Sequence, residues 1–264
     1  MIGRLMVVAA GLTAGAIATW KLALEPTYRA WGVDADDASK PLAGDDAVPE
    51  ATVVDTRRIE IAAPPATVFP WLVQMGYGRA GWYSYDRIDM AGHSVDRIHP
   101  EWQTLAVNDV VPTHPGGGFV VKTIEAERSL VLYLDGELVK EQAEKAAEAG
   151  HGLETAAPNV RAAGTAMGAG FPTDFAASWS FVLEPLEGGR TLLLERVRAR
   201  LGEGTPVSRL VGPLMGYGVF LMTRKQMLGI RDRAEGRILP APETAPLPQP
   251  PTASTGPAPA PTPA

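Results

Sequence analysis

The chain has 264 residues, 45% of them hydrophobic, and a formal net charge of −6 at pH 7. It is long enough for one large domain or two small ones with a real core, and an acidic chain without a basic stripe gives no indication of a nucleic-acid partner. Cysteine is absent, which excludes a disulfide framework, a thiolate metal site and a thiol nucleophile.

The first 25 residues are predicted to be a membrane anchor. Leu5 to Leu24 provides 20 residues in which Lys21 is the only charge, close to the ~20 that a helix needs to span a bilayer. This predicts a single-pass membrane protein, with the side of the membrane left open because the flanking charges are balanced. The alternative is a signal peptide cleaved at the small residues 16–18, which would give an exported protein. Gly11 and Gly15 form a G-x-x-x-G pair that would allow weak dimerisation of such helices.

Two further regions stand apart from the body of the chain. Residues 26–50 are predicted to be an acidic linker or extended arm, because residues 34–50 are rich in Asp and interrupted by Pro and Gly. Residues 239–264 hold 10 prolines and one charge, Glu243. A segment of that composition cannot bury a core, so we expect a disordered tail. The folded domain is therefore expected to span residues 51–238.

The body begins with a strand and a helix. The sequence RRIEIAA (57–63) alternates, with Ile59 and Ile61 facing one way and Arg58 and Glu60 the other, which predicts a half-buried strand. Apolar residues then follow at helical spacing from 68 to 75, after prolines suited to a first helical turn. Pro70 lies inside this segment, so we expect it to kink the helix or to move its start later.

The stretch QMGYGRAGWYSYD (74–86) contains G-x-G-x-x-G at Gly76, Gly78 and Gly81. In a dinucleotide-binding fold a strand precedes these glycines and a helix follows, so that backbone N–H groups point at the pyrophosphate. Here a predicted helix precedes them and an aromatic segment follows. The glycines are instead expected to form a tight turn with positive φ angles, and no nucleotide cofactor is expected.

Strand patterns dominate the rest of the chain. After a short helix near 85–91, strands are predicted at 107–113, 118–127, 129–135, 174–186 and 190–201, the last two joined by a Glu-Gly-Gly turn. Residues 136–172 form a polar insertion whose first half is helical, supported by a Glu141–Lys145 pair. A helix from Pro213 to Gly236 ends the body, with Gly236 as its C-cap. This order predicts an α+β domain in which an antiparallel sheet curls around a helix.

Four blocks of the chain resemble bacterial members of the SRPBCC superfamily, which includes START domains, aromatic polyketide cyclases and the birch-pollen allergen. They are IEIAAPPATVFPWLVQMGYGRAGWYSYD, DRIHPEWQTLAVNDVV, SWSFVLEPLEGGRTLLLERVR and RKQMLGIRDRAE. The arm WGVDADDASKPLAGDDAVP is similar to the preamble of a membrane-anchored branch. The resemblance covers about residues 28–238, but the insertion 136–172 does not match. It implies the helix-grip fold with a hydrophobic pocket for a lipid or polyketide-like molecule, and it supplies no reaction.

Residues of two kinds are candidates for binding that molecule. Aromatic side chains can line an apolar pocket, although ordinary packing between helix and sheet uses the same residue types. A Met-rich apolar stripe on the terminal helix can form the pocket wall. The predicted ligand-binding set is Trp71, Tyr77, Trp82, Tyr83, Tyr85, Trp179, Glu195, Met215, Tyr217 and Phe220.

Glu195 and His99 are the candidate acid/base groups. In TLLLERVRARL, Glu195 falls on the apolar face and Arg196 on the other, so a regular strand would place a carboxylate in the core. A β-bulge would instead turn Glu195 outward. His99 lies in HSVDRIHPE, where the spacing from His93 and the Pro100 break disfavour a metal site. We expect no metal, and a hydrogen-bonded network of Asp96, Arg97, His99 and Glu101.

Three functions fit these features. The first is a membrane-tethered binding or carrier domain for a hydrophobic small molecule, without catalysis. The second is a cyclase or dehydratase that uses Glu195 or His99 as acid/base. The third is a structural envelope protein with a filled core, whose Pro-rich tail recruits a partner.

Overall fold

The computed structural model describes residues 15, 19–88, 93–148, 174–201 and 206–238, with only the backbone described at 21 and at 206–215. The predicted anchor lies mostly outside these residues, as do Gly11, the second half of the insertion and the Pro-rich tail. Among the described residues, no helix combines the length and the apolar character needed to cross a bilayer.

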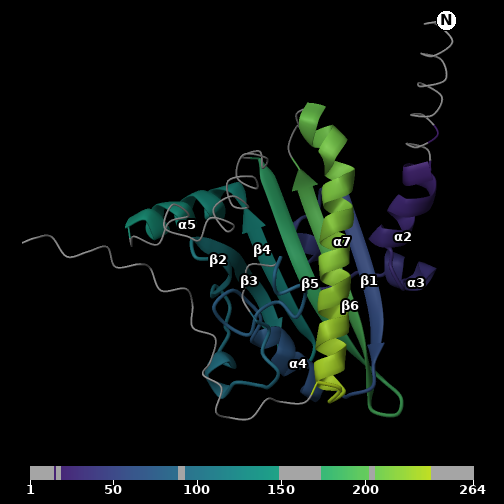
Figure 1. The fold of residues 1–264 in the computed structure, drawn as a ribbon, viewed down its shortest axis with the longest axis vertical. Coiled ribbons are helices and arrows are strands. Elements are labelled where there is room, and N and C mark those ends of the chain that lie inside the picture. The colour runs from purple at the N-terminus through teal and green to yellow at the C-terminus, as the bar shows by residue number, and fades with distance from the viewer. Residues whose placement is uncertain (1–14, 16–18, 89–92, 149–173, 202–205, 239–264) are drawn as a thin grey trace, which may run out of the picture.

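The domain is an α+β fold built on one antiparallel sheet. Its six strands are β1 (Val53–Ile61), β2 (Val110–His114), β3 (Gly117–Glu125), β4 (Ser129–Asp135), β5 (Phe175–Leu186) and β6 (Arg190–Leu201), in the order β1-β6-β5-β4-β3-β2. The α-helices are α2 (Glu25–Arg29), α3 (Ala35–Ser39), α4 (Pro65–Val73), α5 (Gly136–Glu148) and α7 (Pro206–Ala234). The short helices are the π-helix η1 (Trp20–Leu24) and the 3₁₀ helices η2 (Asp45–Ala47) and η3 (Pro100–Trp102). Figure 1 shows α7 lying across the sheet, with α2 and α3 beside β1.

Most of the expected elements are present, with differences at specific places. The two longest strands and the hairpin between them are confirmed, and so is the helix of the insertion with its Lys145–Glu141 bond of 2.6 Å. The terminal helix begins at Pro206, seven residues earlier than expected, and Gly236 follows it with φ 68°. The expected helix near 85–91 is wrong for its described part, since residues 86–88 form a turn.

The glycines of the G-x-G-x-x-G motif form the expected turn. Gly76, Gly78 and Gly81 have φ angles of 130°, 68° and 75°, and Gly76 pairs with Gly81 in an antiparallel bridge. Helix α4 ends just before this turn and runs through Pro70 from a start at Pro65, so the later start, one of the two effects expected of Pro70, is wrong. The motif therefore reverses the chain after a helix, which is not the geometry of a phosphate-binding loop.

The main core lies between the sheet and α7. Ile59 and Ile61 of β1 and Leu193 of β6 are buried there with Met227 and Ile230 of α7. Because side chains alternate along a strand, Glu195 faces this core while Arg196 faces the other side of the sheet.

The opposite side of the sheet is covered by the segment 34–50, the expected linker or arm. Leu42 packs against Leu192 and Leu194. Arg196, which is 3% exposed, donates hydrogen bonds to the backbone carbonyls of Asp37 and Lys40 and to the Asp45 carboxylate. The sheet thus lies between α7 on one face and this segment on the other.

Candidate functional site: a buried charged pair beneath α7

Glu195 lies in the core, on the face of the sheet that α7 covers. Strand β6 pairs without a register shift with both neighbours, so that Glu195 stands opposite Arg57 of β1 and Phe181 of β5. The bulge that would have turned the carboxylate outward is absent from this described strand. Glu195 is 0% exposed, which confirms the alternative based on strand alternation.

The two carboxylate oxygens of Glu195 have different surroundings. Trp179 donates its indole N–H to Oε1 at 2.7 Å. Oε2 is 3.5 Å from the Nη1 atom of Arg57 and has no hydrogen-bond partner among the described residues. Burial raises the pKa of Glu195, and Arg57 and the Trp179 bond oppose that rise only partly.

Arg57 is also 0% exposed and is poorly satisfied. Its Nη2 donates to Asp55 at 3.3 Å, while Nε and Nη1 make no hydrogen bond within the described part of the chain. The Phe220 ring of α7 lies 5.8 Å from the guanidinium carbon. A buried guanidinium costs several kcal/mol unless its N–H groups are paired, so this pair is unlike an ordinary structural ion pair.

The pair is the inner end of a chain of charges that runs along the edge strand. Asp55, two residues before Arg57 on the same face of β1, contacts Arg29 of α2 at 3.1 Å, and Arg29 contacts Glu25 at 2.8 Å. Burial raises the pKa of Asp55 against the opposing effect of Arg57 and Arg29. Helix α2 is thereby linked to the core beneath α7.

Aromatic rings pack beside the charged pair. Trp179, which donates a hydrogen bond to Glu195, stacks on Trp82 with ring centroids 5.6 Å apart. It also packs edge-on with Phe119 and at a tilt with Phe181, with ring centroids 5.7 and 5.1 Å apart. Trp179 thus contacts both Glu195 and Trp82, two other members of the predicted ligand-binding set.

Tyr217 and Phe220 of the predicted set lie on α7 beside the N-terminal helices. Tyr217 meets Trp20 of η1 and Tyr28 of α2, with ring centroids 6.0 and 5.9 Å apart. Phe220 meets Tyr28 at 6.1 Å and Tyr217 at 5.9 Å. The side chain of Met215 lies outside the described residues.

The other predicted aromatic residues occupy different places. Tyr83 packs edge-on against Trp71, donates its hydroxyl to the Trp71 carbonyl and accepts a hydrogen bond from Gln74, so it belongs to the fixed core around α4. Burial raises the pKa of Tyr83 far above its ordinary value. Tyr77 is buried, with a hydroxyl that makes no hydrogen bond to any described residue, and Tyr85 is 43% exposed.

His99 is separate from Glu195. Its imidazole lies 3.4 Å from the Glu101 carboxylate and packs on Trp102 with ring centroids 4.6 Å apart, while Arg97 bonds Asp96. No contact among the described residues joins His99 to Glu195, so the two acid/base candidates share no site. Within the same residues, no three His, Asp or Glu side chains lie close enough to hold a metal ion.

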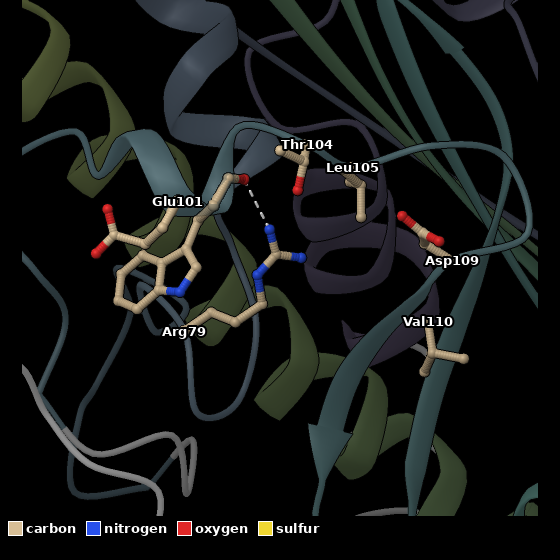
Figure 2. A pocket seen from close by; sticks show the side chains of 7 residues that line it. Arg79, Glu101, Thr104, Leu105, Asp109 and Val110 are labelled. Atoms are coloured by element: carbon tan, nitrogen blue, oxygen red, sulfur yellow. Dashed lines mark hydrogen bonds between the residues drawn. The ribbon is translucent and has the colours of Figure 1, made fainter.

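Two open hollows lie elsewhere on the surface. The larger, of about 350 Å³, is lined by residues around Arg79, whose guanidinium donates to the Trp102 carbonyl at 2.8 Å (Figure 2). The smaller, of about 240 Å³, lies between β2 and α5 and includes Gln142. None of the predicted ligand-binding residues lines either hollow.

Arg57 and Asp55 were missed as candidates by sequence reasoning. The signal was present, because the alternation that turns Ile59 and Ile61 inward also turns Arg57 and Asp55 inward when it is extended toward the start of the strand.

No family model and no curated protein matches this chain. Solved structures that it matches include the Aha1 dimer from Colwellia psychrerythraea (14% identity, TM-score 0.30, covering 70% of this chain and 97% of that one). A protein from Mesorhizobium loti matches with 15% identity and a TM-score of 0.31, covering 67% and 95%. An uncharacterised protein from Rhizobium leguminosarum matches with 15% identity and a TM-score of 0.27, covering 69% and 95%. At these values the comparisons carry no functional argument, and the helix-grip arrangement rests on the strand order and on α7.

Proposed function

We propose that this protein is a helix-grip domain of the SRPBCC type that binds an apolar small molecule between the sheet and α7. The observation that carries the proposal is the Arg57–Glu195 pair. Both side chains are fully buried, yet three of their polar atoms make no hydrogen bond among the described residues, although two of these atoms face each other as an ion pair at 3.5 Å. Buried polar groups in folded proteins are normally paired, so a bound polar group is the natural complement.

The surroundings of the pair fit an apolar ligand. The stacked rings of Trp82 and Trp179 and the ring of Phe220 provide apolar surface next to the polar atoms, and small-molecule sites typically combine such walls with a few polar groups. The pair is enclosed in the conformation described here, so a ligand reaches it when the N-terminal half of α7 moves away from the sheet.

The membrane tether is part of the same proposal. The apolar run from Leu5 to Leu24 has the length of a membrane span, and its described end, η1, leads directly into α2 of the domain. Leu22 and Leu24 of η1 are exposed, at 81% and 46%, which suits a segment close to a lipid surface. Extraction of cell membranes with alkaline carbonate, followed by mass analysis of the mature N-terminus, separates the anchor from a cleaved signal peptide.

The experiment for ligand binding is native mass spectrometry of the full-length chain released from detergent, followed by denaturation and identification of released compounds. We expect an apolar compound bound one to one. Trp179→Ala should lose it because this change removes a wall and the Glu195 partner. Trp102→Ala, which alters the hollow in Figure 2, should keep it.

If Trp102→Ala loses the compound and Trp179→Ala keeps it, the ligand lies in the surface hollow. A wild-type chain that carries no compound, and yields none on denaturation, contradicts the proposed function and favours a structural protein with a filled core.

A further inference from the structure

The larger surface hollow contains an arginine whose hydrogen bonding is incomplete. Nη2 of Arg79 donates to the carbonyls of Val73 and Trp102, at 3.1 and 2.8 Å (Figure 2). The other N–H groups of this guanidinium, on Nε and Nη1, donate to no described residue. Burial lowers the pKa of Arg79, because its guanidinium is partly removed from water. The hollow therefore presents N–H donors that gain from an acceptor on a bound molecule.

Apolar side chains form the walls beside Arg79. Trp102, Leu105 and Val110 line the hollow, which has a volume of about 350 Å³. The Trp102 ring packs on His99, which is 9% exposed, with ring centroids 4.6 Å apart, so the folded domain supports its orientation. Polyproline segments bind to grooves lined by aromatic side chains, and their carbonyl groups make no internal hydrogen bonds. An aromatic wall beside N–H donors suits such a segment.

The charges of the hollow favour an uncharged occupant. Arg79 brings one positive charge, while Glu101 and Asp109, which also line the hollow, bring two negative charges. A strongly anionic ligand would be repelled by the two carboxylates, and a strongly cationic one by the guanidinium. An uncharged segment that offers acceptors and few donors avoids both costs.

The chain itself contains a segment of this kind, PLPQPP at residues 246–251. Four of its six residues are prolines, which have no N–H group and so contribute only acceptors. The segment carries no charge, and the whole of 239–264 carries one, Glu243. Proline also restricts the free chain to the polyproline conformation in advance, which lowers the entropy lost on binding.

The end of α7 places the start of this segment within reach of the hollow. Arg233 donates to the Val95 carbonyl at 2.7 Å, and Ile238 folds back to donate to the Asp232 carbonyl at 3.3 Å. Seven residues separate Val95 from Trp102, a span of at most about 25 Å. The 13 residues between Ile238 and the end of PLPQPP extend to about 40 Å in a polyproline conformation.

We propose that residues 246–251 bind in the hollow of their own chain, with prolines against Trp102 and backbone carbonyls accepting from Arg79. Because both partners belong to one chain, the effective concentration of the segment is about 1 mM. A segment that binds as a free peptide with a Kd of about 0.1 mM then fills the hollow about 90% of the time. This contact is independent of an apolar ligand beneath α7.

Peptide competition tests the proposal. The probe is a fluorescein-labelled peptide with the sequence of residues 239–254, and fluorescence anisotropy measures its binding to the full-length chain in a non-ionic detergent, with detergent alone as the blank. The tail variant carries Pro246→Ser, Pro248→Ser, Pro250→Ser and Pro251→Ser. We expect the peptide to bind the tail variant about tenfold more tightly than the wild type, whose own segment competes.

Substitutions within the tail variant locate the site. Trp102→Ala removes the aromatic wall, and Thr104→Arg brings a long side chain into the hollow from an exposed position. Each should weaken peptide binding about tenfold or more. Tyr85→Ala is the matched control, because it removes a ring that is 43% exposed and does not line the hollow, and it should leave binding unchanged. If Trp102→Ala does not fold, Thr104→Arg decides.

The other outcomes overturn the proposal in distinct ways. Equal binding to the wild type and the tail variant means that the chain's own segment does not occupy the hollow. Absence of peptide binding, or binding that survives both Trp102→Ala and Thr104→Arg, means that the hollow does not bind the segment. A wild-type dimer in analytical ultracentrifugation that the tail variant does not form means that the segment binds a second copy. The compound released in native mass spectrometry tests the proposed function separately.

Discussion

Gly229 is required where α7 crosses the turn after α4. A Cβ atom at this position would lie 2.2 Å from the Tyr83 carbonyl oxygen, which belongs to the backbone and cannot move aside. We predict that Gly229→Ala destabilises the protein by about 1–3 kcal/mol, the usual cost of overpacking a core. Thermal unfolding followed by circular dichroism measures it.

Gly218 is the matched control on the same helix, since a Cβ atom there meets no atom of the described residues within 4 Å. Gly218→Ala should stabilise the protein by roughly 0.5–1 kcal/mol through helix propensity alone. Equal effects of the two substitutions would contradict the close approach of α7 to Tyr83.

Glu195 gives the protein a defined pH dependence. Its pKa in the folded state is raised above the ordinary 4.5, so the folded protein holds this proton more tightly than the unfolded chain does. The contribution of Glu195 to the free energy of unfolding is therefore fully present below pH 4.5. It falls as pH rises toward the raised pKa, by at most about 1.4 kcal/mol per pH unit.

Glu195→Gln removes that loss. We predict that the melting temperature of the variant, relative to wild type, increases between pH 4.5 and pH 8, while Glu60→Gln gives no such trend. Asp55, with a pKa raised by burial, remains in both proteins, so its contribution largely cancels in the comparison. A constant difference across this range would show that Glu195 is ionised throughout.

At the scale of elements, the segment 34–50 is held to the sheet by Arg196. Its guanidinium donates to three backbone carbonyls of this segment and to Asp45 while nearly completely buried. We predict that Arg196→Ala costs about 3–5 kcal/mol, as expected for breaking a buried pair. Chemical denaturation of the full-length chain provides the measurement.

Arg200, four residues further along β6 on the same face, is the control. It is 42% exposed in its side chain and pairs with Asp174 at 3.2 Å, and such surface pairs contribute about 0–1 kcal/mol. If Arg196→Ala is no more damaging than Arg200→Ala, the segment 34–50 does not contribute to the stability of the fold.

The strands were predictable because their patterns are local. The alternation in β6 and the Glu-Gly-Gly turn define the hairpin with β5 from sequence alone, and they place Glu195 and Arg196 on opposite faces. The packing of the segment 34–50 was not predictable in the same way. Its composition is that of a linker, and its carbonyl groups are bonded by an arginine more than 140 residues away.

The candidate site was predictable only in part for a similar reason. Trp179 and Glu195 were both named from the sequence, and the structure joins them by a hydrogen bond. Arg57 became part of the site through the pairing of β1 with β6, the first strand with the last. Such a pairing depends on topology, and no local pattern in either strand encodes its register.

At the scale of the whole molecule, the two halves of α7 are held differently. The C-terminal half is fixed by polar contacts: Ser84 donates to the Met222 carbonyl, and Arg233 donates to the Val95 carbonyl. The part near Tyr217 and Phe220 is held by rings, through Trp20 and Tyr28. Ring contacts can separate without leaving buried hydrogen bonds unpaired, so, on the proposed function, we expect the part of α7 near Tyr217 and Phe220 to move when a ligand enters.

Hydrogen–deuterium exchange of the full-length chain tests this difference. We predict faster exchange of amides at 216–221 than at 226–234, because local opening follows the strength of local contacts. Tyr217→Ala removes the ring that joins α7 to both N-terminal helices, and should accelerate exchange at 216–221 while leaving 226–234 unchanged. Uniform acceleration along α7 would mean that the helix opens as one unit, and access to Arg57 and Glu195 would then require separation of the whole helix from the sheet.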